Sequence, residues 1–165
     1  MMRSIFFILI TIITPELMAQ GVVFNKTYNY LGTEVGGRVL SYNDSFFVIG
    51  DVYGTPYKPF LLKTDNSGSE PNFHEIDISS WTTSHGYGKS ATIINSNQLL
   101  LCGFYNDTIT TNPYIAIIDF GGNVVLKSLF EGNAAFHSVI KKDNKIATCG
   151  YRSVNGKAYF EMCFF

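Results

Sequence analysis

Three stretches of the chain superpose without a gap when three glycines, Gly50, Gly103 and Gly150, are aligned. The stretches read VLSYNDSFFVIG, TIINSNQLLLCG and VIKKDNKIATCG. Each contains an apolar segment, a short polar turn, and a second apolar run that closes on the glycine. Turn-forming residues between two apolar runs indicate a β-hairpin. The sequence therefore predicts one antiparallel unit that occurs three times.

Two further apolar segments follow the hairpin in the first two copies. The runs PFLLKTD and PYIAIID each end in an Asp-led turn, and the segments FHEIDI and NVVLKSLF come next. The aligned glycines are 53 and 47 residues apart. Four short strands in about 40 to 50 residues is the period of a propeller blade, which buries both faces only by stacking on its neighbours. We therefore predict an all-β, β-propeller-type fold with about three four-stranded antiparallel blades. The predicted repeats span about 36–83, 84–133 and an incomplete 134–165.

The repeat resembles a known group of bacterial proteins. An apolar run, Gly, a variable loop and then [FY]-[LI]-x-[IL]-x-[TI]-D-x-x-G is similar to the secreted β-propeller repeats of the delta-60 and SBBP type, over about residues 36–165. Such proteins often carry a separate C-terminal secretion sorting module. The resemblance implies a propeller and export from the cell, and it says little about activity. The loops after Gly50 and Gly103 depart from the family pattern, because they lack its Ser/Gly-rich GxxD segment.

Two segments bear on how such a ring would close. Residues 21–32, GVVFNKTYNYLG, resemble residues 123–132 and are predicted to form an orphan fourth strand. The last residues, FEMCFF, read as the third strand of the last copy. One expectation is that the chain is the N-terminal part of a longer propeller, a fragment whose orphan strand belongs to the larger ring. The other is a homodimer formed by strand exchange, in which each orphan strand completes the last blade of its partner.

The first residues are typical of an export signal. Arg3 precedes the short apolar core IFFILITII, and Leu17 and Ala19 occupy the small-residue positions before a cleavage site ahead of Gln20. The apolar core is about half the ~20 residues that a membrane-spanning helix needs. The sequence thus predicts a signal peptide at 1–19, a propeller-like domain at 20–165, a secreted or cell-surface location and no membrane span.

Composition and cysteine content exclude several classes. The net charge is −1 and only 15% of residues are charged, so the chain offers no basic stripe for a nucleic-acid partner. Cys102, Cys149 and Cys163 are widely spaced, odd in number, and part of no metal-ligand pattern. We expect free thiols, with one disulfide as the alternative, and neither a metal nor a cofactor.

Catalytic motifs are equally sparse. The sequence contains no GxSxG, HExxH, Walker or EF-hand pattern, so no catalytic residue is predicted. His74 and His137 fall in strand-like segments and are interpreted as structural residues. Asp65 and Asp119 are interpreted as turn residues, since each is followed by a glycine a few positions on. An acid pair contributed by different blades stays open.

Loops offer better candidates for a site. In a propeller, the connections from fourth to first and from second to third strand gather on one face, and binding residues concentrate on such loops. Aromatic rings with a polar edge suit the binding of a glycan or a protein segment. The alternative is that these rings cover the blade ends and contact only each other. The predicted rim residues are Trp81, His85, Tyr87, Tyr53, Tyr57, Tyr105 and Arg152, with Trp81, the single tryptophan, as the strongest candidate.

The function expected from these features is that of a secreted or surface binding scaffold without catalytic activity. Its partner would be a glycan or another protein. The alternative is part of a propeller-fold hydrolase or lyase that degrades glycans, and a truncated product without its own function is a third interpretation. The positions after the aligned glycines hold Asp51, Phe104 and Tyr151, so no acid repeats there, which favours binding over catalysis.

Overall fold

The computed structural model describes residues 27–30, 33–54, 56–78, 85–106 and 109–165. This part of the chain is all β, with eleven strands in three antiparallel sheets and no helix, as the sequence predicted. The first sheet contains β1 (Thr33–Tyr42), β2 (Ser45–Tyr53), β3 (Lys58–Asp65) and β4 (Asn72–Glu75). The second contains β5 (His85–Asn95), β6 (Gln98–Asn106), β7 (Thr111–Asp119) and β8 (Val124–Leu129). The third contains β9 (Ala134–Lys142), β10 (Lys145–Val154) and β11 (Lys157–Phe164).

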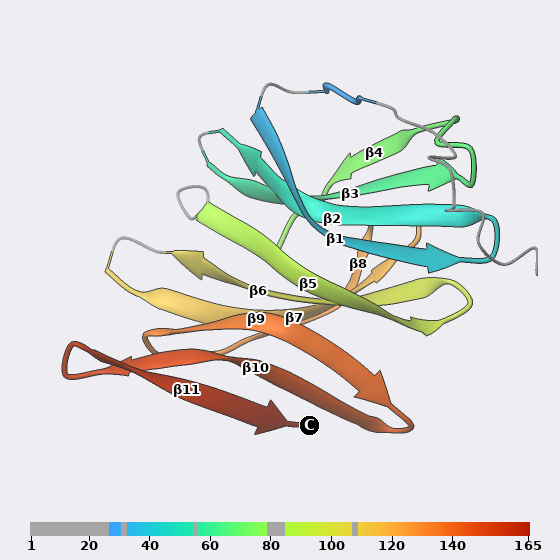
Figure 1. Ribbon diagram of the computed structural model, residues 1–165. Coiled ribbons are helices and arrows are strands. Elements are labelled where there is room, and N and C mark those ends of the chain that lie inside the picture. Colours follow the sequence, from blue (N-terminus) through green and yellow to red (C-terminus); the bar gives the residue numbers. More distant parts are fainter. Residues whose placement is uncertain (1–26, 31–32, 55, 79–84, 107–108) are drawn as a thin grey trace, which may run out of the picture.

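The three sheets form a stack with the second sheet in the middle (Figure 1). The first strand of each later sheet crosses the face of the sheet before it. Strand β5 contacts β1, β2 and β3, and β9 contacts β5, β6 and β7 in the same way. The step from the first sheet to the second is therefore repeated from the second to the third.

Two apolar layers hold the stack together. In the first layer, Phe47, Ile49 and Leu61 of the first sheet share a buried cluster with residues of β5, β6 and β7. In the second layer, Leu100 and Cys102 of the second sheet pack with residues of β9. The second sheet is thus buried on both faces, which explains why β6 reads as the continuous apolar run LLLC instead of alternating. Each such buried aliphatic side chain contributes roughly 1.5–3 kcal/mol.

A β-bulge in the first strand of each sheet lies beside the aligned glycine. The register of β1, β5 and β9 skips one residue at this point, and the skipped residues are Gly37, Lys89 and His137. The bulge brings a backbone carbonyl against the glycine of the neighbouring strand. A Cβ atom on Gly103 would lie 1.8 Å from the carbonyl oxygen of Tyr87.

The other two aligned glycines meet the same obstacle. A Cβ on Gly50 would lie 2.1 Å from the carbonyl oxygen of Val35, and one on Gly150 would lie 1.8 Å from that of Ala135. Real Cβ atoms do not approach an oxygen this closely. Steric exclusion by the bulge therefore accounts for glycine at all three positions.

The predicted turn roles of Asp65 and Asp119 are confirmed. Asp65 Oδ1 accepts hydrogen bonds from the backbone N–H groups of Ser67 and Ser69, and Asp119 Oδ1 accepts them from Gly121 and Asn123. Burial tends to raise the pKa of Asp119, but the hydrogen bonds from Asn123 and Gly121 lower it overall.

The predicted orphan strand at 21–32 is described only in part. Its described part, 27–30, lies against the first sheet, where the Tyr28 hydroxyl donates to the carbonyl of Gly68 and the Tyr30 ring stacks on Phe73 at 4.6 Å. The third sheet has three strands among the described residues, and no fourth strand pairs with β11. The stacking of Tyr30 on Phe73 of β4 is a contact that the sequence pattern did not predict. Residues 1–26, including the predicted signal peptide, lie outside the described residues.

Candidate functional site

Aromatic rings from all three sheets meet in one continuous row, which we call the aromatic row. Ring centroids are 5.0 Å apart for Tyr53 and Tyr57, 5.6 Å for Tyr57 and Tyr87, and 4.6 Å for Tyr87 and Phe104. The row continues at 6.0 Å from Phe104 to His137 and at 5.7 Å from His137 to Tyr151. The aromatic row therefore consists of Tyr53, Tyr57, Tyr87, Phe104, His137 and Tyr151.

Backbone structure positions these rings. Tyr53 ends β2 and Tyr57 immediately precedes β3. The carbonyl of Tyr57 accepts a hydrogen bond of 2.9 Å from the N–H of Gly86 in β5, which ties the first sheet to the second next to the row. Phe104 and Tyr151 each follow an aligned glycine, so the bulges present both rings at the same height of their sheets.

A single cation sits on the central rings. Lys89, the extra residue of the β5 bulge, places its Nζ atom 5.0 Å from the ring centroid of Tyr87 and 5.4 Å from that of Phe104. The same Nζ lies 3.1 Å from Oδ2 of Asp51, whose Oδ1 accepts a 2.6 Å hydrogen bond from the N–H of Gly88. Cation–π attraction and the ion pair together fix the ammonium group at the row.

Burial shifts the pKa of three groups around Lys89. Burial raises the pKa of Asp51, partly offset by the N–H of Gly88 and the charge of Lys89. Burial also raises the pKa of the Tyr87 hydroxyl, so this group stays protonated. The pKa of His137 is lowered, first by burial and then by Lys89, so the imidazole is neutral at pH 7. The Lys89–Asp51 pair thus lies next to two ring side chains, Tyr87 and His137, whose uncharged forms are favoured by burial.

The row is open to solvent along part of its length. Tyr53 is 40% exposed, His137 is exposed as well, and Tyr57, Tyr87, Phe104 and Tyr151 are half-buried. Asp51, by contrast, is only 4% exposed, and both of its oxygens are hydrogen-bonded. The rings can therefore contact a ligand directly, while the carboxylate supports Lys89 from beneath.

The structure brings together three of the predicted rim residues, Tyr53, Tyr57 and Tyr87. It places Tyr105 elsewhere, because this side chain is 7% exposed and belongs to the apolar layer between the first and second sheets. Arg152 also lies away from the row, on the side of β10 opposite to Tyr151. There its Nε atom donates to Glu161 at 2.9 Å. Trp81 lies outside the described residues, and His85 begins β5, with its side chain also outside the description.

Sequence reasoning missed four members of this site. Phe104 and Tyr151 could have been predicted as equivalent positions from the sequence, since both stand directly after an aligned glycine. Lys89 and His137 occupy the bulge, and their equivalent in β1 is Gly37, so the three sequences share no residue type there. Only the register of the paired strands shows that these positions correspond.

The described residues contain neither a metal site nor a disulfide. In this part of the chain, no group of three His, Cys, Asp or Glu side chains could hold a metal ion. The three cysteines are free thiols, as expected, and burial raises the pKa of Cys102 to about 12. No described helix is long and apolar enough to cross a membrane. A comparison with models of protein families finds no match for this chain, and a comparison with curated proteins finds none either.

Proposed function

We propose that this protein is a non-catalytic binding scaffold of the β-propeller type, which binds its ligand along the aromatic row. The observation that carries the proposal is the continuity of six rings across three sheets, with Lys89 held at their centre. Half-exposed rings with polar edges, next to one fixed cation, offer apolar faces and hydrogen-bonding groups together. A glycan fits this combination best, and a protein segment is the other class of ligand.

The repeated stacking step supports the propeller part of the proposal. Each aligned glycine faces a bulge, and each later sheet meets its predecessor through its first strand. Radial stacking of four-stranded units has this repeated contact. The resemblance to delta-60 and SBBP repeats agrees with it as an expectation from the sequence.

Binding can be tested with the purified chain on an array of immobilised glycans. Tyr57→Ala removes a ring in the middle of the contact between the first and second sheets. We expect it to raise the Kd for the glycan at least 10-fold, a loss of ~1.4 kcal/mol of binding free energy. Tyr159→Ala is the matched control, because Tyr159 is a 53% exposed tyrosine of β11 that does not belong to the row. Equal loss in both variants, or no loss in Tyr57→Ala, would contradict the proposal. Trp81→Ala, made alongside, tests the prediction from the sequence that Trp81 contributes.

Catalysis on a glycan is the second candidate, and Asp51 is the observation that favours it. Burial raises the pKa of its carboxyl, as a general acid requires, although the N–H of Gly88 and the charge of Lys89 offset part of that rise. Its low exposure and its two hydrogen-bonded oxygens favour the binding role. Incubation of bound polysaccharide with the protein separates the two, since release of reducing ends that Asp51→Asn abolishes would establish the hydrolase or lyase.

Export is proposed from the sequence alone. If residues 1–19 are removed on secretion, N-terminal sequencing of the protein from culture medium will begin at Gln20. Protein that is retained in the cytoplasm with Met1 or Met2 at its start would contradict a secreted or surface location.

A further inference from the structure

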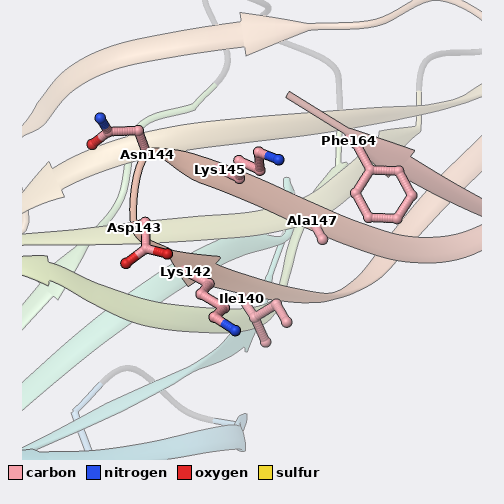
Figure 2. A pocket seen from close by; sticks show the side chains of 7 residues that line it. All are labelled: Ile140, Lys142, Asp143, Asn144, Lys145, Ala147 and Phe164. Carbon is pink, nitrogen blue, oxygen red and sulfur yellow. The ribbon is translucent and has the colours of Figure 1, made fainter.

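One face of the third sheet exposes a row of apolar side chains. Its exposed apolar side chains come from β9 and β11, where Phe160 and Phe164 reach 74% and 71% exposure, and the exposed Lys142 and Lys145 lie at its β9–β10 end. The same face forms a groove of about 510 Å³ at the turn between β9 and β10, where Ile140, Ala147 and Phe164 lie side by side on three paired strands (Figure 2). We call this surface the forward face of the third sheet.

Equivalent faces are buried in the first two sheets. Met162 pairs with the residue just before its aligned glycine, as do Leu61 and Ile115 in the sheets before it. Leu61 is 0% exposed and Ile115 is 8% exposed, because β5 and β9 cross these positions, whereas Met162 is 52% exposed. The forward face of the third sheet thus has the character of a surface that receives the first strand of another sheet.

The first sheet presents the matching surface. Val39 pairs with the residue two positions before its aligned glycine, and Ala91 and Val139 occupy the same register in β5 and β9. Ala91 and Val139 are 0% and 3% exposed, since each packs on the preceding sheet, whereas Val39 is 61% exposed. Tyr28 and Tyr30 cover only the outer part of this side, near β4.

From this complementarity we infer that two copies of the chain associate, with β1 of each copy packed across the forward face of the third sheet of the other. The contact would repeat the step already made between the first and second sheets and between the second and third. Each copy contributes its forward face to one contact and its β1 side to the other. Two such contacts, related by a two-fold axis, therefore close the assembly. Two copies bring together six sheets, within the roughly four to eight blades of known propellers, and three copies would exceed that range. The aromatic row borders this contact, because Tyr151 pairs with Phe160, but the inference uses no property of the ligand that the row binds.

The mass of the full chain in solution tests it, measured by light scattering after size exclusion. We expect a discrete species of twice the 18.4 kDa of one chain. Val39→Lys and Met162→Lys each place a charge in the contact, and each should reduce the mass to that of one chain. Val125→Lys is the matched control, since Val125 is 55% exposed on β8, outside both faces, and should leave the larger species intact. Unchanged circular dichroism of the variants shows that their fold persists.

Mixing the two charged variants examines the unlike pairing itself. The forward face of the Val39→Lys chain and β1 of the Met162→Lys chain are both intact, so the mixture should regain a species of two chains through one contact. Loss of association in Met162→Lys alone, with Val39→Lys unaffected, would mean that forward faces meet each other, and it would overturn the inference. A wild-type chain that is monomeric, or that forms larger or heterogeneous species, would overturn it too.

Discussion

Replacing the middle aligned glycine gives the strongest test of why the repeat has its sequence. In Gly103→Ala the new Cβ would lie 1.8 Å from the carbonyl oxygen of Tyr87 and 2.8 Å from the hydroxyl of Tyr114. That hydroxyl donates a 2.8 Å hydrogen bond to the same carbonyl, and Tyr114 is fully buried. The methyl group must therefore displace β5 from β6 and weaken this bond.

The cost follows from these two effects. Loss of the Tyr114 hydrogen bond costs about 1 kcal/mol. Overpacking in a dense core adds about 1–3 kcal/mol. A total of about 2–4 kcal/mol is below the roughly 5–15 kcal/mol of a typical domain, so the variant should fold and melt on the order of 10 °C lower.

Thermal unfolding followed by circular dichroism measures this, with Gly54→Ala as the matched control. A Cβ on Gly54 would meet only the carbonyl of Pro56, at an ordinary 3.5 Å, so the free energy of unfolding should change by less than about 0.5 kcal/mol. Adding Tyr114→Phe to Gly103→Ala removes the contact with the Tyr114 hydroxyl but leaves the closer contact with the carbonyl oxygen of Tyr87. The double variant should therefore not regain the melting temperature of the wild type. A Gly103→Ala protein that melts like Gly54→Ala would refute the steric explanation.

Three further predictions concern single side chains. The folded state holds the proton of Asp51 more tightly than the unfolded chain does, so wild-type stability should fall as pH rises from about 4 through the raised pKa of Asp51. Urea unfolding of Asp51→Asn across this range should lack that slope, and an unchanged slope would exclude Asp51 as its source. The pKa of Asp119 is lowered, so its contribution is present above about pH 4 and is lost as pH falls through the folded pKa; Asp119→Ala should cost about 1 kcal/mol at pH 7 and little in acid. Cys102 is buried with a pKa of about 12, so a thiol reagent should label it only after denaturation, and rapid labelling in the native protein would contradict its burial.

The alignment on three glycines was enough to predict the hairpins. The turns at Asn43, Ser96 and Asp143 fall where the polar residues interrupt the apolar runs, and the later strands follow the Asp-led segments. Local patterns determine these features, because alternation and turn chemistry act over a few residues. The strands nevertheless continue beyond the glycines, where the sequence suggested that they close.

The aromatic row depends on register and stacking, which no local pattern records. Tyr57 and Tyr87 could be expected together, since the sequence predicted both in loops at one end of the repeats, although Tyr87 belongs to β5. Lys89 and His137 could not, because a bulge shifts the register by one residue and so changes the side to which each residue points. Tyr105 points the other way from the half-buried Phe104, because neighbouring residues of β6 alternate sides, and it is buried in the layer against the first sheet.

The aromatic row exists only if the three sheets stack in the observed order, and nuclear Overhauser effects between ring protons test that most directly. Tyr57 and Tyr87 join the first sheet to the second, with ring centroids 5.6 Å apart, and Phe104 and His137 join the second to the third, at 6.0 Å. Stacking in this order predicts a cross-peak for each pair in the wild-type protein. If the strands are intact but both cross-peaks are missing, the sheets do not bring their rings into one row, and the proposed binding surface is not formed.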